Sequence, residues 1–195
     1  SDVCSSDLDA GSRDIPEGWD LLRWICLSVR EEFPGRIVIA EDMHEDPAIT
    51  STGDEGAAFH AQWDSAFVHP VRAAISAADD ESRSVSAVAD AVQRTYNGDA
   101  FQRVVFTESH DEVANGKARV VTEIDADDPT GWYAQKRSTL GAALVMTSPG
   151  IPMLFQGQEF LQGEWFRDDV PLDWDLDREH RGIVRLYHDL VRLRL

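Results

Sequence analysis

Two short apolar runs in this chain each end abruptly in ionisable side chains. Residues 37–40 lead directly into Glu41 and Asp42, and residues 104–105 open a segment, VVFTESHDE, that contains Asp111. Carboxyl groups can donate or accept a proton, and as carboxylates they stabilise a nearby positive charge. We therefore interpret Glu41 and Asp111 as candidates for a site built from acids. Exposed acids at the ends of strands are the alternative for either residue taken alone.

The apolar runs indicate the elements that would position these acids. Continuous apolar runs of this length are typical of strands that are buried on both faces of a parallel sheet. The chain is predicted to alternate strands with helices, the strands at 37–40, 59–63, 103–107 and 151–155 and the helices at 19–32, 71–78, 84–96, 132–146 and 178–195. Long loops are predicted at 112–131 and 160–176. This alternation predicts an α/β fold with a parallel sheet.

Composition limits the possible partners. The chain has 195 residues, enough for one domain with a core, and 36 acids against 18 bases give a net charge of −18. That charge argues against nucleic acid or an anionic membrane surface as a partner, because both attract basic patches. No apolar stretch approaches the roughly 18–20 residues that span a bilayer. We expect a cytoplasmic protein.

No metal or cofactor is expected from the sequence. Cys4 and Cys26 form no CxxC pair, and His44, His60 and His69 have spacings that fit no short metal-binding motif. The chain also contains no GxGxxG or Walker pattern that would cradle a phosphate group.

The first eight residues, SDVCSSDL, need a separate interpretation. They contain no initiator Met and no apolar signal-peptide core, and they match a translation of the sequencing-adapter end TCAGACGTGTGCTCTTCCGATCT. We expect residues 1–8 to be an assembly artefact and residues 9–195 to be the native part. Natural coding sequence across Leu8 in the source DNA would contradict this expectation.

Three blocks in a fixed order resemble the α-amylase superfamily. They are IVIAED around Glu41, VVFTESHDE around Asp111, and PGIPMLFQGQE at 149–159. The longer form ESHDEVANGKARV and the loops at 163–166 and 171–174 are most similar to the 1,4-α-glucan branching-enzyme type within that superfamily.

The resemblance covers roughly residues 14–195 and implies a fold. Superfamily members form a (β/α)8 barrel, in which catalytic groups lie at the carboxyl ends of the strands. The four predicted strands would be the fifth to eighth of the barrel, so residues 9–195 would form its C-terminal half. The family's DGxRxD block, which carries the nucleophilic Asp, does not occur in this chain. The resemblance therefore implies that the partner is a missing N-terminal half of the same enzyme.

The resemblance also implies roles for particular residues. Glu41 would be the general acid and then the base, Asp111 would stabilise the transition state, and His110 would bind sugar hydroxyls. A proton donor of this kind needs burial and neighbouring carboxylates, so we expect Glu41 at the tip of a buried strand. Trp165 and Phe166 are expected to stack on glucose rings, with packing on the barrel rim as the alternative.

The implied activity is that of a retaining enzyme acting on α-glucans such as glycogen or starch. The chain is expected to be a fragment of a branching enzyme, which cleaves α-1,4 links and forms α-1,6 branches in glycogen biosynthesis. An α-amylase-type hydrolase and a non-catalytic carbohydrate-binding module are the alternatives. Because the nucleophile is missing, the chain alone is expected to be inactive.

Overall fold

The computed structural model describes residues 15–195, so the predicted adapter segment at 1–8 lies outside the described residues. Four strands form one sheet in the order β1-β2-β3-β4, and every neighbouring pair is parallel. The strands are β1 (Ile39–Ala40), β2 (Ala61–Trp63), β3 (Arg103–Val105) and β4 (Ile151–Pro152). The predicted α/β fold with a parallel sheet is confirmed, although each strand is shorter than its apolar run.

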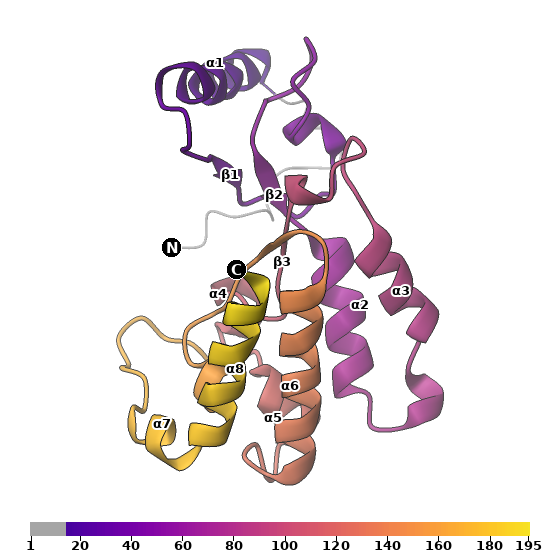
Figure 1. Cartoon of the computed structure of the whole chain (residues 1–195), viewed down its shortest axis with the longest axis vertical. Helices are drawn as coiled ribbons and strands as arrows, with labels where there is room; N and C mark the ends of the chain where they lie inside the picture. The colour runs from indigo at the N-terminus through magenta and orange to yellow at the C-terminus, as the bar shows by residue number, and fades with distance from the viewer. Residues whose placement is uncertain (1–14) are drawn as a thin grey trace.

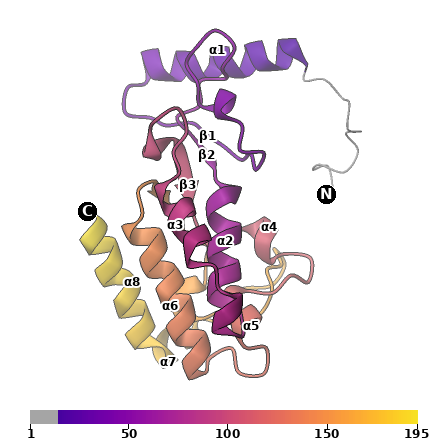
Figure 2. The ribbon, with the colours of Figure 1, turned by 90° about the vertical axis from the view of Figure 1, so that its right-hand side faces the viewer.

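Helices occupy most of the remaining chain. They are α1 (Pro16–Glu32), α2 (Ser65–Ser76), α3 (Val85–Gln93), α4 (His110–Val113), α5 (Val120–Ile124), α6 (Trp132–Thr147), α7 (Asp175–Glu179) and α8 (Arg181–Arg194), with 3-10 turns η1 (Pro47–Ile49), η2 (Asp80–Ser82), η3 (Ala100–Gln102) and η4 (Gln158–Phe160). Helices α2, α3, α6 and α8 lie side by side, whereas α1 lies across the opposite end of the molecule (Figures 1 and 2). Within residues 15–195, no helix has both the length and the apolar character needed to cross a membrane.

The prediction of a helix at 71–78 was wrong about where the helix begins. Helix α2 begins at Ser65, and Pro70 lies inside it rather than in its first turn. A proline at an interior position removes one helical hydrogen bond. Phe67 and Val71 are both fully buried on the same helix, so their packing on the sheet outweighs the local cost of the proline.

The end of the next helix was also predicted wrongly. The pattern over 84–96 places the end of the helix at Asn97 and Gly98, but α3 stops earlier. Asn97 and Gly98 instead adopt left-handed conformations, with φ of 50° and 78°, in a tight turn that pairs Tyr96 with Asp99. Gly and Asn favour this conformation in turns as well as at helix ends, so the local signal was ambiguous.

The predicted loop at 112–131 contains two short helices, α4 and α5. The first backbone N–H of α5, at Val120, donates to a side-chain oxygen of the buried Glu108. The predicted loop at 160–176 includes the end of η4 and the start of α7. These turns depend on contacts between distant residues, which periodicity in the sequence does not register.

The sheet separates two apolar clusters. On one face, Val105 of β3 packs with Phe67, Val71, Ala91 and Val145 from α2, α3 and α6. The second cluster joins the buried residues Ala61, Val68, Val104 and Phe106 to the partly buried residues Met43, Trp63, Ile151 and Met153. Both clusters have partly buried members at their edges, which in the first cluster are Val88, Val92 and Leu144.

Helix α1 is attached to the rest of the chain mainly by arginines. Arg30 donates to the carbonyl oxygens of Ala58 (3.1 Å) and Phe59 (3.0 Å). Arg23 donates to the carbonyls of residues 52, 53 and 56. Several apolar side chains of this region remain exposed, including Trp24 (66%) and Phe33 (56%). The apolar face of α1 is therefore largely uncovered by the described residues.

Candidate active site

The structure brings Glu41, His110 and Asp111 together at the carboxyl edge of the sheet. Nε2 of His110 lies 3.3 Å from Oε1 of Glu41 and 3.4 Å from Oδ1 of Asp111. One oxygen of each carboxylate and a ring nitrogen of His110 all lie within 4.8 Å of one another. Glu41 follows β1 and Asp111 follows β3, and both strands pair in parallel with β2, so their ends lie on one edge.

A short cap presents the His110–Asp111 pair. The hydroxyl of Ser109 accepts a hydrogen bond from the backbone N–H of Glu112 (3.3 Å), which is a typical helix N-cap. Lys117 Nζ donates to the backbone carbonyl of Asp111 (2.8 Å). These bonds hold the backbone on both sides of the histidine and leave its ring and the Asp111 carboxylate free to face Glu41.

A buried ion pair anchors the segment that leads to this cap. Nη1 of Arg119 lies 3.0 Å from Oε2 of Glu108, and both side chains are almost fully buried. Burial raises the pKa of the Glu108 carboxyl group, and the positive charge of Arg119 opposes that shift. Arg119 also donates to the carbonyls of Gln156 (2.8 Å) and Glu164 (3.1 Å). The end of β3 is thereby fixed to the loops that follow β4.

The three converging side chains are open to solvent. The exposed fraction is 53% for Glu41, 47% for His110 and 61% for Asp111. Glu41 thus lies at the tip of β1, and the described residues leave its carboxyl group about half exposed. The apolar run ends at Ala40, and Glu41 projects beyond the edge of the sheet, where none of the described elements covers it.

The two expected aromatic ligands of sugar have different surroundings. Phe166 packs edge-on against Phe155, with ring centroids 5.2 Å apart, and its backbone N–H donates to the carbonyl of Val113 (2.7 Å). Trp165 is 38% exposed, and the guanidinium of Arg167 lies 5.3 Å from its ring centroid. No contact described for either residue reaches the acids. Phe166 therefore packs against another aromatic side chain, whereas Trp165 is partly exposed.

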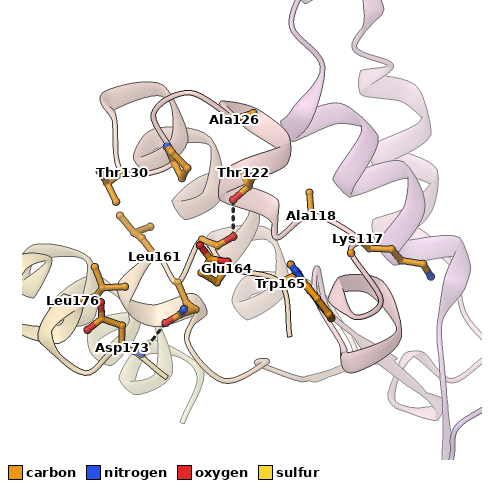
Figure 3. Close-up of a pocket in the computed structure, with 14 residues that line it drawn as sticks. Lys117, Ala118, Thr122, Ala126, Thr130, Leu161, Glu164, Trp165, Asp173 and Leu176 are labelled. Atoms are coloured by element: carbon orange, nitrogen blue, oxygen red, sulfur yellow. Dashed lines mark hydrogen bonds between the residues drawn. The ribbon is translucent and has the colours of Figure 1, made fainter. Parts of the chain in front are cut away.

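Trp165 lines a pocket of about 490 Å³ (Figure 3). The hydroxyl of Thr122 donates to the carbonyl of Gly163 (2.8 Å), and the N–H of Asp173 donates to the side-chain oxygen of Gln162 (3.1 Å). These two bonds hold the walls of the pocket together. Lys117, which donates to the backbone of Asp111, belongs to the same wall as Trp165. The hydrogen bond of Lys117 therefore connects the lining of the pocket to the backbone of Asp111.

The three histidines weighed as metal ligands take three separate partners. The ring of His60 accepts from the N–H of Val38 (3.0 Å), and burial lowers its pKa. His44 lies 3.4 Å from Asp42, and His69 lies 3.4 Å from Glu112.

Two functional contacts were missed by sequence reasoning. One is the ion pair of Glu108 and Arg119. The only signal for it in the sequence was that both residues lie in the segment ESHDEVANGKARV. The other is Trp63, whose indole meets the ring of His110 edge-on. The polar, aromatic end of β2 was the available signal for Trp63, but nothing local in the sequence links it to residue 110.

Solved structures with a similar fold are enzymes of the α-amylase type. The chain superposes on a pullulanase from Anoxybacillus sp. LM18-11 in complex with maltotetraose with a TM-score of 0.67 and 20% identity, over 90% of this chain and 28% of the pullulanase. It also superposes on a putative alpha amylase from Salmonella typhimurium with a TM-score of 0.67 and 17% identity, over 96% of this chain and 42% of that protein. These likenesses show that the described residues share the fold of the matching part of these enzymes.

Curated sequences narrow the resemblance. The chain is 31% identical over 196 residues to 1,4-alpha-glucan branching enzyme GlgB 1 of Xanthomonas axonopodis pv. citri, and 31% identical over 195 residues to GlgB of Paramagnetospirillum magneticum. These matches cover 94% of this chain but only 25% and 24% of the relatives, so the chain spans about a quarter of their length. No family model matches the chain. The resemblance to the α-amylase superfamily, and within it to branching enzymes, is confirmed.

Proposed function

We propose that this chain is part of a 1,4-α-glucan branching enzyme. The observation that carries the proposal is the convergence of Glu41, His110 and Asp111 from two different strand ends, within 4.8 Å of one another. The same residues lie in the motifs that led to the resemblance, and the sequence relatives are named branching enzymes. The parent would cleave an α-1,4 link of a glucan and rejoin the chain as an α-1,6 branch.

We further propose that the chain is the C-terminal half of a (β/α)8 barrel, with β1 to β4 as the fifth to eighth strands. The parallel order of the strands supports this arrangement. The second apolar cluster supports it as well, since its members Trp63, Ile151 and Met153 are only partly buried. A closed barrel removes the open edges of a sheet and fills its interior with side chains. The partner is then the N-terminal half of the same enzyme, which would cover β1 and the exposed face of α1.

The proposed chemistry assigns one step to each acid. Glu41 gives its proton to the oxygen that leaves the cleaved bond and later takes a proton from the incoming glucan hydroxyl. The carboxylate of Asp111 stabilises the positive charge that develops on the sugar ring in the transition state. The covalent bond to the sugar is made by an Asp of the missing half, so Glu41 and Asp111 do not form a complete pair of acid and nucleophile.

Substrate contacts are proposed for His110, Trp165 and Phe166. His110 lies between the two acids, where its ring N–H can donate to a sugar hydroxyl. The free face of Trp165 borders a pocket and suits the C–H surface of a glucose ring. The packing of Phe166 on Phe155 supports an indirect part, in which Phe166 holds the loop that carries Trp165.

The test is made on the full-length parent supplied with linear amylose. Loss of iodine colour together with new α-1,6 links supports branching, whereas new reducing ends without branches would favour the hydrolase alternative. Changing Glu41 to Gln, or Asp111 to Asn, should lower the rate by about 10²–10⁴, the range for loss of a positioned acid or base. Glu55→Gln, at an exposed acid between η1 and β2, serves as the control. Equal rates for Glu41→Gln and this control would contradict the proposal.

The chain alone is proposed to be inactive, since the attacking Asp is supplied from elsewhere. Turnover of amylose by purified residues 9–195 would contradict this.

A second function, a non-catalytic carbohydrate-binding module, is favoured by one observation: a pocket that includes Trp165 is lined by residues of this chain. Binding of maltooligosaccharides by the chain, in a gene that encodes no upstream barrel half, would select this alternative.

A further inference from the structure

Trp63 connects the buried interior of the sheet to the candidate site. It is the last residue of β2 and is in register with Val104 of β3. Its ring meets Phe106 edge-on, with centroids 5.2 Å apart and planes at 63°, and Phe106 is fully buried. The same ring meets His110 with centroids 5.9 Å apart and planes at 71°. The indole therefore touches a fixed core residue and the exposed imidazole at once.

The strand end that carries Trp63 is held by a buried polar network. The next residue, Asp64, is fully buried, and one of its oxygens lies 3.1 Å from Nη1 of Arg103. The hydroxyl of Tyr96 donates to the other oxygen (3.1 Å), and the N–H of Asp64 donates to the carbonyl of Val104 (3.2 Å). These contacts fix the backbone directly after Trp63, so the indole is presented from a rigid base.

His110 has weaker restraints of its own. Its polar contacts are to the carboxylates of Glu41 and Asp111, and all three groups are about half exposed. Ion pairs between exposed groups are screened by solvent and order side chains poorly. An aromatic edge-to-face contact depends on relative ring orientation, and it is not screened in the same way.

We propose that Trp63 is a positioning residue: its indole holds the imidazole of His110 in the orientation that directs Nε2 at Glu41 and Asp111. The catalytic importance of this orientation rests on the proposed function, but the positioning itself is a property of this chain. A residue on a rigid strand thus sets the geometry of a residue on a short, exposed turn. Precise placement of a group that contacts substrate commonly depends on such a supporting contact.

The experiment is nuclear magnetic resonance on the full chain, without substrate. In the wild-type chain, we expect cross-relaxation between the ring protons of Trp63 and His110, and chemical shifts of the His110 ring protons displaced from those of free histidine. Trp63→Leu should remove this displacement, average the χ1 angle of His110 over several rotamers, and weaken cross-relaxation between the His110 ring and Glu41. Trp63→Phe, which keeps a smaller aromatic ring, should retain a single His110 rotamer.

Trp24→Phe is the matched control, because Trp24 is an exposed tryptophan on α1, and it should leave the His110 signals unchanged. The proposal is overturned if the wild-type chain shows no Trp63–His110 cross-relaxation, or if His110 keeps one rotamer in Trp63→Leu. Amide spectra verify that each variant retains the fold. Should Trp63→Leu lose the fold, Trp63→Met takes its place: averaging of the His110 rotamer is expected there, and a single rotamer overturns the proposal. None of these readouts involves glucan, so failure of the proposed function would leave them unaffected.

Discussion

The helices on the two sides of this chain are attached to the sheet in different ways. Helices α2, α3 and α6 pack side chains against β3. Two of these side chains, Phe67 and Val145, have almost no exposed surface. Helix α1 leaves Trp24 exposed, buries one side chain fully, Cys26, and forms hydrogen bonds from Arg23 and Arg30 to loop carbonyls. Apolar burial is the main source of folding stability, and a hydrogen bond contributes less in net terms.

This difference shows that the two parts of the chain bury their apolar side chains to different extents. The part from β2 to α8 contains a buried apolar core, whereas the part around α1 presents apolar side chains that the described residues do not cover. The following predictions test whether stability is distributed as the comparison implies.

The largest effect is expected from a matched pair of phenylalanines. Phe67→Ala empties a fully buried position and should lower the free energy of unfolding by about 3–5 kcal/mol. Phe33→Ala removes the same atoms from an exposed position at the C-terminal cap of α1 and should change the free energy of unfolding by less than about 0.5 kcal/mol. Urea denaturation of the full chain measures both values. Similar losses in the two variants would remove the distinction between the regions.

A smaller effect is expected at the buried ion pair. Arg119→Lys keeps the positive charge but cannot reach Glu108, Gln156 and Glu164 together, so buried acceptors lose their donor. We expect a loss of about 1–3 kcal/mol, the cost of leaving buried polar groups unpaired. Arg178→Lys is the control, since Arg178 is exposed and lies 3.9 Å from Asp175. If denaturation shows no difference between these variants, the anchor is not needed.

A local effect is expected at the attachment of α1. Arg30→Ala removes the bonds to Ala58 and Phe59, each worth about 0.5–1.5 kcal/mol, so amides of α1 should exchange about fivefold to 150-fold faster. Amides of α6 should not change, because α6 packs in the other region. Hydrogen exchange with mass spectrometry resolves the two helices. Arg36→Ala, an exposed arginine just after α1, should leave both rates unaltered, and faster exchange throughout the chain would contradict local attachment.

The smallest effect concerns pH. Because burial raises the pKa of Glu108, the folded chain binds that proton more tightly than the unfolded chain does. The contribution to stability is complete below the ordinary pKa near 4.5 and is lost as pH rises through the raised value. Glu108→Gln should abolish this decline, whereas the exposed control Glu55→Gln should retain it. Denaturation at a series of pH values provides the two slopes, and parallel curves for wild type and Glu108→Gln would refute the prediction.

The sequence was sufficient for the fold class and for the convergence of the acids. Apolar runs before Glu41 and before Glu108 located β1 and β3, and parallel pairing brought their ends together. The start of α2 was missed because a proline is a strong local signal, whereas the burial that overrides it depends on β3.

Parts of the site could not be predicted for a related reason. Trp63 and His110 meet only after β2 and β3 pair, so no window of sequence contains both. The exposure of Glu41 was also beyond the sequence, since an apolar run does not reveal how much of its surroundings the same chain supplies.

The two outer strands of the sheet differ in their capacity to recruit another strand. The backbone N–H of Met153 donates to the carbonyl of Val105 in β3. Along a strand, the backbone N–H and C=O groups of successive residues point alternately toward the two borders, so those of Pro152 point away from β3, toward the open border of the sheet. Proline has no N–H, and this border of the sheet lacks a donor where a neighbour would need one. The proposed barrel needs a neighbouring strand on both borders, so the strand beside β4 would have to pair without the donor that Pro152 lacks.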